Sequence, residues 1–500
     1  MGTTHTTQLI RSPLSRRLLS LVLAASLAVA PLEGWSDVYQ DLPDMGSASG
    51  SVLTPLQEKQ LGRAFMRYVR ATQKVIDDPL LDDYINTLGM ELVNRSEARG
   101  TRFTFFLVDD PQINAYAGPG GYIGVYTGLV LTTQSENELA AVLAHEITHV
   151  IQKHLLRAFS DNQDLGLIQG AALLAAILVG TLAGGDAGLA AAVGAQAAIQ
   201  QHQINFTRQN EKEADRIGID IMEQAGFDPR AMPTFFARMG RANRAYSTKL
   251  PEFLRTHPVT NSRIADSLGR AEAYPYRQKE DSLRYLLTRA AIREMNFQDP
   301  QDAILHFRTA LKEGRYRSRT AARYGLARAL YRAQQYDHAA KEVAPLLQEH
   351  PETLEFIVAA SLIDVERGKR NKALARLEEA RARLPFSLPL RLTLAELYLR
   401  TGKPRKAYDD LQKLTGIHSE NTRIYRLLAR AAADMGHAAE SHQYLATHYY
   451  LMGGLEAARL QLKIALRQPE LDDYERARIE SQLEKVENEL EQLKKDKKKK

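Results

Sequence analysis

Two histidines and one glutamate at a fixed spacing are the residues of this sequence best suited to chemistry. His145-Glu146-Ile147-Thr148-His149 is an H-E-x-x-H pentad within a run that predicts a helix. Because residues four apart lie on one face of a helix, the imidazoles of His145 and His149 can share one metal ion. Glu146 is then placed to take a proton from a metal-bound water. The pentad therefore predicts a zinc centre for hydrolysis, with Glu146 as the general base.

A zinc centre that keeps one position open for water needs a third protein ligand. Glu211 and Asp215 are four residues apart and share a helix face, so one carboxylate can bind the metal while the other orients a neighbouring group. Glu213 points to another side and is the less favoured ligand. His154 and His202 are rivals, but neither lies at a spacing that explains a ligand role. We interpret both as ordinary core or surface histidines.

The elements predicted around the pentad are suited to hold it rigidly. Ser135 and Glu138 form an S-x-x-E capping box at the start of the helix. The stretches 103–108 and 122–126 predict strands, and the loop over 114–121 between them is rich in turn residues. Apolar residues recur at helical spacing after the capping box and predict a buried face. They are Leu139, Val142, Leu143, Ile147, Val150 and Ile151.

The second predicted strand leads to the helix that contains the H-E-x-x-H pentad, which we call the metal helix. A strand beside such a helix can serve as an edge that pairs with an extended peptide substrate. An ordinary hairpin within the sheet is the alternative, and the two interpretations are compatible. The residues predicted to form the substrate edge are Tyr122, Ile123, Gly124, Val125 and Tyr126.

The carboxyl-terminal half repeats every 34 residues, which is the period of tetratricopeptide repeats. Small residues recur at this spacing, where they let paired helices approach closely or turn between helices. They are Ala339, Ala373 and Ala407, and Gly368, Gly402 and Gly436. Such solenoids usually bind protein segments in a concave groove, and a purely structural role is the alternative.

Charge limits the class of partner. The net charge of +6 comes from the ends, because the first 30 residues carry +3 and the last seven carry +5, which leaves about −2 for the body. The sequence therefore predicts no nucleic-acid-binding body. The Lys-rich tail predicts a solvated end, with weak attraction to anionic lipid or RNA as the alternative.

The amino terminus predicts export. Arg11, Arg16 and Arg17 precede an apolar run over 18–30, as in a signal peptide, with cleavage near Ala30 or a few residues later. An uncleaved anchor is the alternative, but the run is short for a membrane span. Export of a chain without cysteine suits the bacterial periplasm, where disulfides are optional.

Residues 165–200 are apolar and rich in Gly and Ala, with a break at 184–186. The first half is about 17 residues long, which is marginal for a membrane span. We expect an Ala/Gly-rich helical hairpin near the active-site cleft. Peripheral contact with a membrane or gating of the substrate is the alternative.

His257 is a candidate regulatory fourth ligand. It lies in a Pro-containing loop after the predicted catalytic core, from which it can reach the open metal position and keep the enzyme latent. The alternative is a histidine that caps a helix or packs beside Tyr274. We favour the metal role, because a periplasmic protease must be restrained.

H-E-x-x-H at 145–149 with E-x-x-A-D at 211–215 resembles the CAAX-prenyl-protease type of gluzincin metallopeptidase. The loop over 114–121, the segment 256–263, the predicted signal peptide and the repeats make the chain most similar to its bacterial periplasmic members. The resemblance implies work on precursors of outer-membrane barrel proteins at their assembly machinery. It also implies one zinc ion per chain, with ligands His145, His149 and Glu211, catalytic base Glu146 and assisting acid Asp215.

Together these features predict a mostly α protein, in which an α+β zincin domain with a small sheet precedes an all-α tetratricopeptide-repeat solenoid. The expected segments are a signal peptide over 1–36, a mobile lead-in over 37–53, the metallopeptidase domain over 54–275, the repeats over 281–470, and a charged helix with the Lys-rich tail over 471–500.

The leading functional interpretation is a periplasmic zinc endopeptidase with chaperone-like activity on outer-membrane barrel precursors, whose repeats recruit these substrates or the barrel assembly complex. The alternative is a repeat-based chaperone or scaffold of that machinery with a largely latent zinc site. A zinc hydrolase of non-peptide substrates is weaker, because a peptide-binding solenoid has no obvious use there. Asp215 has two open roles, as a proton donor and as a carboxylate that orients His145.

Overall fold

The computed structural model describes residues 53–98, 101–160, 208–245, 252–469 and 471–498, and the isolated positions Gly2, Gly170, Leu174 and Leu178. The predicted signal peptide and lead-in, apart from Gly2 and Leu53, lie outside the described residues, and so do His202 and most of 165–200. The contacts divide the chain into two units, Met1–Val52 and Leu53–Lys500. The second unit contains both the elements around the pentad and the repeats.

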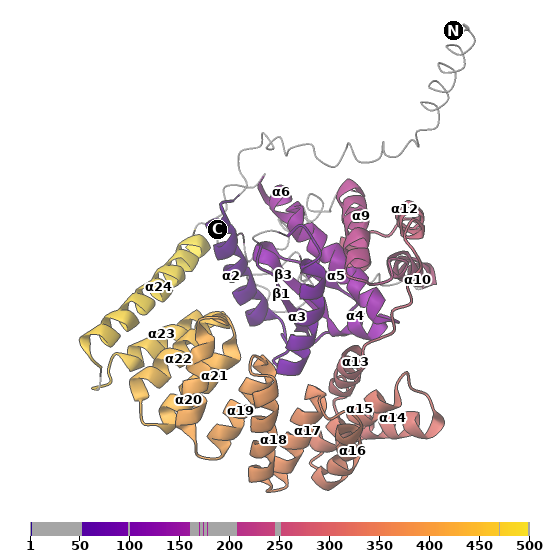
Figure 1. Ribbon diagram of the computed structural model, residues 1–500. Helices are drawn as coiled ribbons and strands as arrows, with labels where there is room; N and C mark the ends of the chain where they lie inside the picture. The colour runs from indigo at the N-terminus through magenta and orange to yellow at the C-terminus, as the bar shows by residue number, and fades with distance from the viewer. Residues whose placement is uncertain are drawn as a thin grey trace. The chain divides into compact units, whose positions relative to one another are not determined.

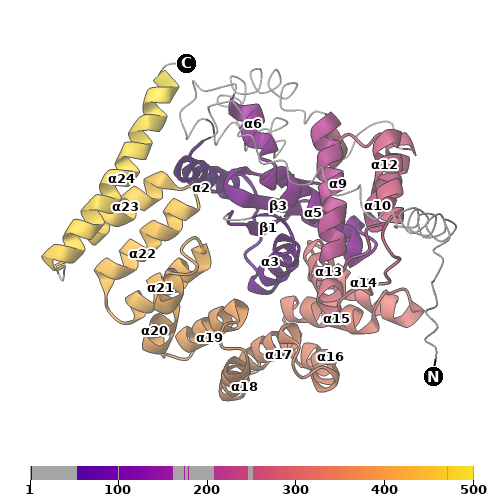
Figure 2. The same cartoon turned by 45° about the horizontal axis from the view of Figure 1, so that its top comes forward.

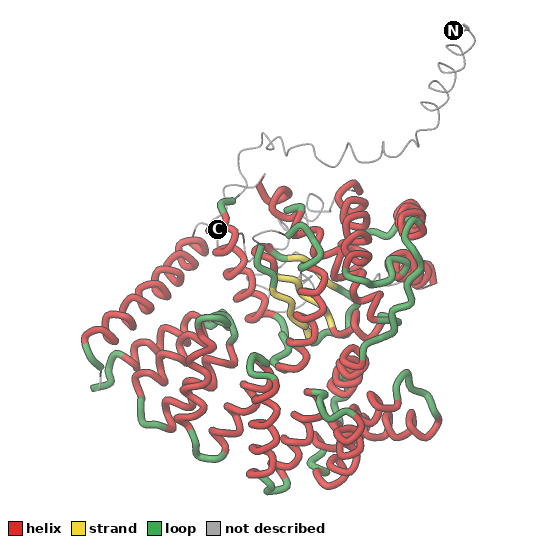
Figure 3. The backbone as a smooth tube through the Cα atoms, viewed as in Figure 1, coloured by secondary structure: helices red, strands yellow, loops and turns green. Residues whose placement is uncertain are grey.

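Helices dominate the described residues, and three short strands form one small sheet (Figures 1 and 3). This arrangement confirms the predicted mostly α fold class. The elements that precede the repeats are α2 (Pro55–Thr72), α3 (Pro79–Val93), β1 (Thr104–Val108), β2 (Ala115–Ala117), η1 (Pro119–Gly121), β3 (Tyr122–Tyr126), α4 (Thr127–Thr132), α5 (Glu136–Ile151), α6 (His154–Ser160), α9 (Arg208–Gln224), α10 (Ala231–Ala245), α11 (Glu252–Thr256) and α12 (Asn261–Glu272).

The repeats form a stack of consecutive helices, each packed against the next along most of the series (Figure 1). Gly368, Gly402 and Gly436 lie at the predicted helix–helix turns with φ of 78°, 68° and 83°, a region that favours glycine. The helices are α13 (Leu283–Met295), α14 (Pro300–Glu313), α15 (Arg319–Arg332), α16 (Tyr336–Glu349), α17 (Leu354–Glu366), α18 (Arg370–Arg383), α19 (Leu388–Arg400), α20 (Pro404–Thr415), α21 (Thr422–Asp434), α22 (Ala438–Leu451), α23 (Leu455–Ala465) and α24 (Asp473–Lys498).

The sheet has the strand order β1-β3-β2, with β1 parallel and β2 antiparallel to β3. The predicted edge strand is therefore wrong: Tyr122, Ile123, Gly124, Val125 and Tyr126 form the central strand, and Gly124 pairs with both Phe106 and Tyr116. The reason is the turn-rich stretch over 114–121, which contains a strand of its own. Gly120 and Gly121, with φ of 73° and 77°, turn the chain so that β2 folds back onto β3.

The metal helix α5 is buried at every position from Glu136 to His149. It packs against α3, α9, α10 and β2, and Figure 2 shows it between α9 and the sheet. The Ser135 side chain accepts a hydrogen bond from the Glu138 backbone N–H (3.2 Å), as expected of the helix cap. The carboxylate of Glu138, however, accepts from the Gln134 N–H (2.6 Å) rather than from Ser135. The elements on all sides of α5 leave its catalytic residues little freedom to move.

One apolar core joins these elements to the first repeats. Its buried residues run from Ile76 through α5 and the sheet to Ile363 in α17. Arg289 of α13 donates hydrogen bonds to the carbonyls of Leu131 (3.0 Å) and Thr133 (2.6 Å) at the end of α4. The repeats are thus packed into the same structure that positions the pentad.

Part of the apolar stretch over 165–200 also packs on this unit. Leu174 and Leu178 are helical and buried, and they join an apolar cluster with Leu155 of α6 and Tyr116 of β2. Two residues four apart lie on one helix face, so this face is directed at the protein core. Among the described residues, none of the helices has both the length and the apolar content needed to cross a membrane.

Candidate metal centre

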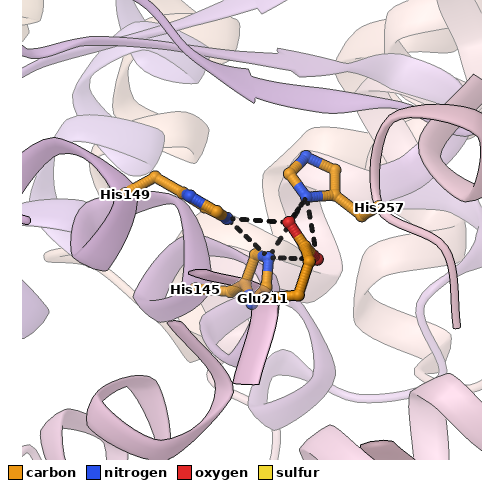
Figure 4. Close-up of side chains that lie close together, drawn as sticks. All are labelled: His145, His149, Glu211 and His257. Atoms are coloured by element: carbon orange, nitrogen blue, oxygen red, sulfur yellow. Dashed lines mark hydrogen bonds and ion pairs between the residues drawn. The ribbon is translucent and has the colours of Figure 1, made fainter. Parts of the chain in front are cut away.

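Four buried side chains from three parts of the chain direct donor atoms at one another (Figure 4). His145 and His149 come from α5, Glu211 from the first turn of α9, and His257 from the residue after α11. His145 Nε2 lies 3.0 Å from His149 Nε2 and 3.3 Å from His257 Nδ1. Glu211 Oε1 lies 3.5 Å from His149 Nε2 and 3.1 Å from His257 Nδ1. All four residues are at most 2 % exposed.

These distances fit a metal ion. Donor atoms about 2.0–2.1 Å from a tetrahedral zinc lie about 3.3 Å from one another. The neighbouring donor atoms lie 3.0 Å to 3.6 Å apart, on both sides of that value, and one donor atom from each of the four residues lies within 4.8 Å of the other three. Three imidazoles and one carboxylate are also donors that suit a divalent transition metal. No second grouping of three or more such side chains occurs in the part of the chain that the structure describes.

Glu146 is fully buried beside this cluster. Its Oε1 lies 3.4 Å from His257 Nε2. Burial raises the pKa of the Glu146 carboxyl, while the charges of His257 and His145 oppose the rise. A carboxyl group with a raised pKa is better able to hold a proton, as a general base must do during the reaction. The helix α5, which carries Glu146, packs against the strand β2.

Asp215 lies behind His145 rather than in the cluster. Its Oδ1 is 3.0 Å from His145 Nδ1, on the opposite side of the ring from the donor atom Nε2. Arg263 donates to both Asp215 oxygens, from Nε to Oδ2 and from Nη2 to Oδ1, each at 2.7 Å. Both carboxylate oxygens therefore have partners.

Arg263 also belongs to the site, although no role for it was predicted. It is 3 % exposed, and its Nη1 lies 2.7 Å from Glu211 Oε2 while the fork binds Asp215. Nη1 also donates to the Pro258 carbonyl (2.9 Å), which fixes the loop that carries His257. The Asn261-Ser262-Arg263 segment could be singled out in the sequence. The pairing of the Arg263 guanidinium with the Asp215 carboxylate, 48 residues away, could not be recognised from spacing.

The charges of this cluster reinforce one another. Burial works against an ionised Glu211, yet the positive charges of His257 and Arg263 lower the pKa of Glu211 to about 2. Burial also works against a charged His257, yet the carboxylates of Glu211 and Glu146 raise its pKa. Burial, with the neighbouring charge of His145, holds the pKa of His149 well below its ordinary value. Glu211 is thus a permanent anion, which is the state that a metal ligand requires.

His154 is a buried core histidine outside the donor cluster, but it is also a direct neighbour of that cluster. It is 1 % exposed, and its Nδ1 lies 2.8 Å from Nδ1 of His149. Its Nε2 lies 3.2 Å from Glu213 Oε2. Glu213 itself is outside the cluster, with a side chain that is 39 % exposed.

Comparison with known proteins agrees with this geometry. Residues 79–271 match the model of peptidase family M48, and residues 296–356 and 364–431 match tetratricopeptide repeats. The chain is 36 % identical over 473 residues to the beta-barrel assembly-enhancing protease of Escherichia coli (strain K12), which covers 95 % of this chain and 96 % of the relative. The chain belongs to the beta-barrel assembly-enhancing protease family. The predicted resemblance is thereby confirmed.

Other relatives define the breadth of this family and its neighbours. The beta-barrel assembly-enhancing protease of Yersinia pestis is 36 % identical over 470 residues, 94 % of this chain and 96 % of the relative. The mitochondrial metalloendopeptidase OMA1 of Schizosaccharomyces pombe is 30 % identical over 183 residues, 36 % of this chain and 50 % of that protein. Like other members of the beta-barrel assembly-enhancing protease family, this chain is therefore a metallopeptidase with tetratricopeptide repeats.

Proposed function

We propose that this metallopeptidase is a periplasmic zinc endopeptidase with chaperone-like activity, which acts on precursors of outer-membrane barrel proteins. The observation that carries the zinc role is the convergence of four buried donor atoms within 4.8 Å of one another, next to Glu146. The predicted signal peptide supports the periplasm. The name of the E. coli relative, which is 36 % identical, supports barrel proteins as substrates.

In this proposal His145, His149 and Glu211 hold one zinc ion. When bound, zinc polarises the scissile carbonyl and makes water more acidic. The Glu146 carboxylate accepts the proton of the attacking water and passes it to the leaving amine. Asp215 keeps the His145 ring oriented through the 3.0 Å contact to Nδ1, and because Arg263 holds both of its oxygens, we assign it this role rather than proton donation.

His257 is proposed as the latch that keeps the enzyme inactive. Its Nδ1 belongs to the donor cluster, and its Nε2 lies 3.4 Å from Glu146 Oε1, so one ring covers both the fourth metal position and the base. The adjoining helix α11 also covers the active-site edge of the sheet, since Phe253 N–H donates to the Ile113 carbonyl (3.1 Å) just before β2. Displacement of this segment would open the metal and the β2 edge together, and we propose β2 as the strand that pairs with substrate.

The repeats are proposed to bind protein substrates and the barrel assembly complex. Part of their surface is already used by the peptidase, because Arg423 donates to the Asp77 carbonyl (2.8 Å) and Arg284 pairs with Asp83 (2.7 Å). A cavity of about 510 Å³ lies beside these contacts, with lining residues from Lys74–Leu80 and from the repeats. The second candidate function, a chaperone or scaffold with a latent zinc site, is favoured by the position of His257.

The first experiment measures zinc content and cleavage of an unfolded outer-membrane barrel protein by wild type, Glu146→Gln and His257→Ala. We expect one zinc per chain in wild type and Glu146→Gln, with cleavage reduced about 10²–10⁴-fold by loss of the general base. His257→Ala should cleave severalfold faster than wild type, because the latch is removed.

The same variants separate the candidate functions. Suppression of barrel-protein aggregation that survives in Glu146→Gln identifies chaperone activity, whereas degradation does not survive. Wild type without zinc would contradict the proposed peptidase. Equal cleavage and equal zinc geometry in His257→Ala and wild type would contradict the latch.

A further inference from the structure

The metal-facing histidine His149 has an imidazole behind it, whereas His145 has a carboxylate behind it. The Nδ1 atoms of His149 and His154 are 2.8 Å apart, and the side chain of His154 is fully buried. His154 Nε2 is 3.2 Å from Oε2 of Glu213, whose side chain reaches solvent. A chain of hydrogen-bonding atoms therefore runs from the donor cluster through two imidazoles to the surface.

The backbone explains how His154 comes to lie there. The helix α5 ends at Ile151, and Lys153 adopts φ of 52°, in the left-handed region that residues other than glycine rarely occupy. This turn starts α6 at His154 and returns its side chain to the His149 ring. An unfavourable conformation at a lysine is retained where the surrounding structure depends on it.

If His149 Nε2 faces a metal ion, the contacts between His149, His154 and Glu213 favour one arrangement of protons. His149 Nε2 faces the donor cluster, so it must offer its lone pair there, and its proton must lie on Nδ1. His154 Nδ1 must then accept that proton's hydrogen bond, which leaves the His154 proton on Nε2, facing Glu213. A proton on both facing Nδ1 atoms would place two donors 2.8 Å apart without an acceptor.

We propose that His154 is a positioning residue that sets the tautomer and orientation of His149 for zinc, and that Glu213 in turn sets the tautomer of His154. The inference rests on the proposed metal role of His149. The two zinc-binding imidazoles are then supported differently: His145 by a carboxylate that Arg263 binds, and His149 by a neutral imidazole. Loss of such an outer partner typically weakens metal binding about 10–100-fold.

The test measures the zinc affinity of the full chain by competition with a chromophoric chelator, starting from chelator-stripped protein. His154→Asn and His154→Leu have nearly the same shape, but only Asn presents an oxygen near the position of Nδ1 to accept from His149. We expect His154→Leu to bind Zn²⁺ about 10–100-fold more weakly, and His154→Asn to recover most of that loss. Glu213→Ala, at a part-exposed position, should show a smaller loss.

The matched control is the same pair of substitutions at His448 in α22, whose Nδ1 donates to the Thr422 carbonyl (3.0 Å) far along the chain from the site. Zinc affinity should not change in either control. Equal losses in His154→Asn and His154→Leu would overturn the inference, because packing alone would then explain them, and so would unchanged affinity in His154→Leu. Wild type that binds no Zn²⁺ would overturn the proposed function, and this inference with it.

Discussion

At the scale of single residues, the chemistry of this protein depends on what lies behind each metal-facing atom. The pentad could be predicted because helical spacing alone brings His145 and His149 to one face, whereas Glu211, on another helix, was expected from its spacing to Asp215 and from the resemblance to known metallopeptidases. Arg263 and His154 could not, because their contacts depend on how α12 and the left-handed turn at Lys153 return to the core. Side chains that share a face of one helix can be predicted from their spacing in the sequence, whereas contacts between helices cannot.

The role of Asp215 can be tested at this scale. Asp215→Asn weakens the acceptor for His145 Nδ1 and leaves Arg263 without a full counter-charge. If Asp215 orients His145, we expect about a 10–100-fold loss of zinc affinity. The measurement is chelator competition on the full chain. Asp266→Asn, at a half-exposed position in α12, is the control, and an unchanged affinity with a lower kcat would instead assign proton donation to Asp215.

At the scale of elements, the long helices were predictable and the short strand was not. The helix α5 has a capping residue and a sustained apolar period, so it is visible in the sequence. The strand β2 has three residues inside a run of turn-forming residues, and no period can be recognised over so short a length. The strand β3 is central because β2 pairs with its second side. Since β2 was not predicted, β3 was wrongly expected to be an edge strand.

The turn before β3 gives a prediction for this scale. A Cβ on Gly121 would lie 2.0 Å from the Arg102 carbonyl oxygen, and its φ of 77° disfavours any side chain. Gly314 has a similar φ of 68°, but a Cβ there would have no heavy atom within 4 Å. Substitution of Gly314 therefore measures only the cost of a left-handed backbone at a residue with a side chain, about 1–2 kcal/mol. We expect Gly121→Ala to lower the thermal midpoint clearly more than Gly314→Ala, as measured by circular dichroism. Equal shifts would show that the β2–β3 turn tolerates the clash.

At the scale of the whole molecule, the repeats are part of the peptidase core. Tyr285, Leu287 and Ile292 of α13 are fully buried, and the Tyr285 hydroxyl lies 2.9 Å from Thr133 Oγ1. The period of 34 residues predicted the solenoid but not this packing, because a repeat pattern describes contacts between neighbouring repeats only. The sequence predicted a domain boundary near residue 280, but the apolar core contains residues from both sides of this position.

A fragment that ends at residue 280 should therefore fail to fold. Each large apolar side chain that α13 withdraws from the core removes about 1.5–3 kcal/mol, and several of them approach the whole stability of a domain, about 5–15 kcal/mol. We expect a fragment over 53–280 to aggregate on size-exclusion chromatography, whereas residues 53–498 elute as folded protein. A monomeric short fragment with native helical content would contradict this expectation.

The covered edges of the small sheet have a further consequence. Val75 forms an antiparallel bridge to Val108 on the outer side of β1, and all three residues of β2 are buried. Exposed strand edges are the usual templates for aggregation between chains. With both outer strands partly covered, we expect the sheet of the described residues to be a poor template for the addition of further strands from other polypeptides.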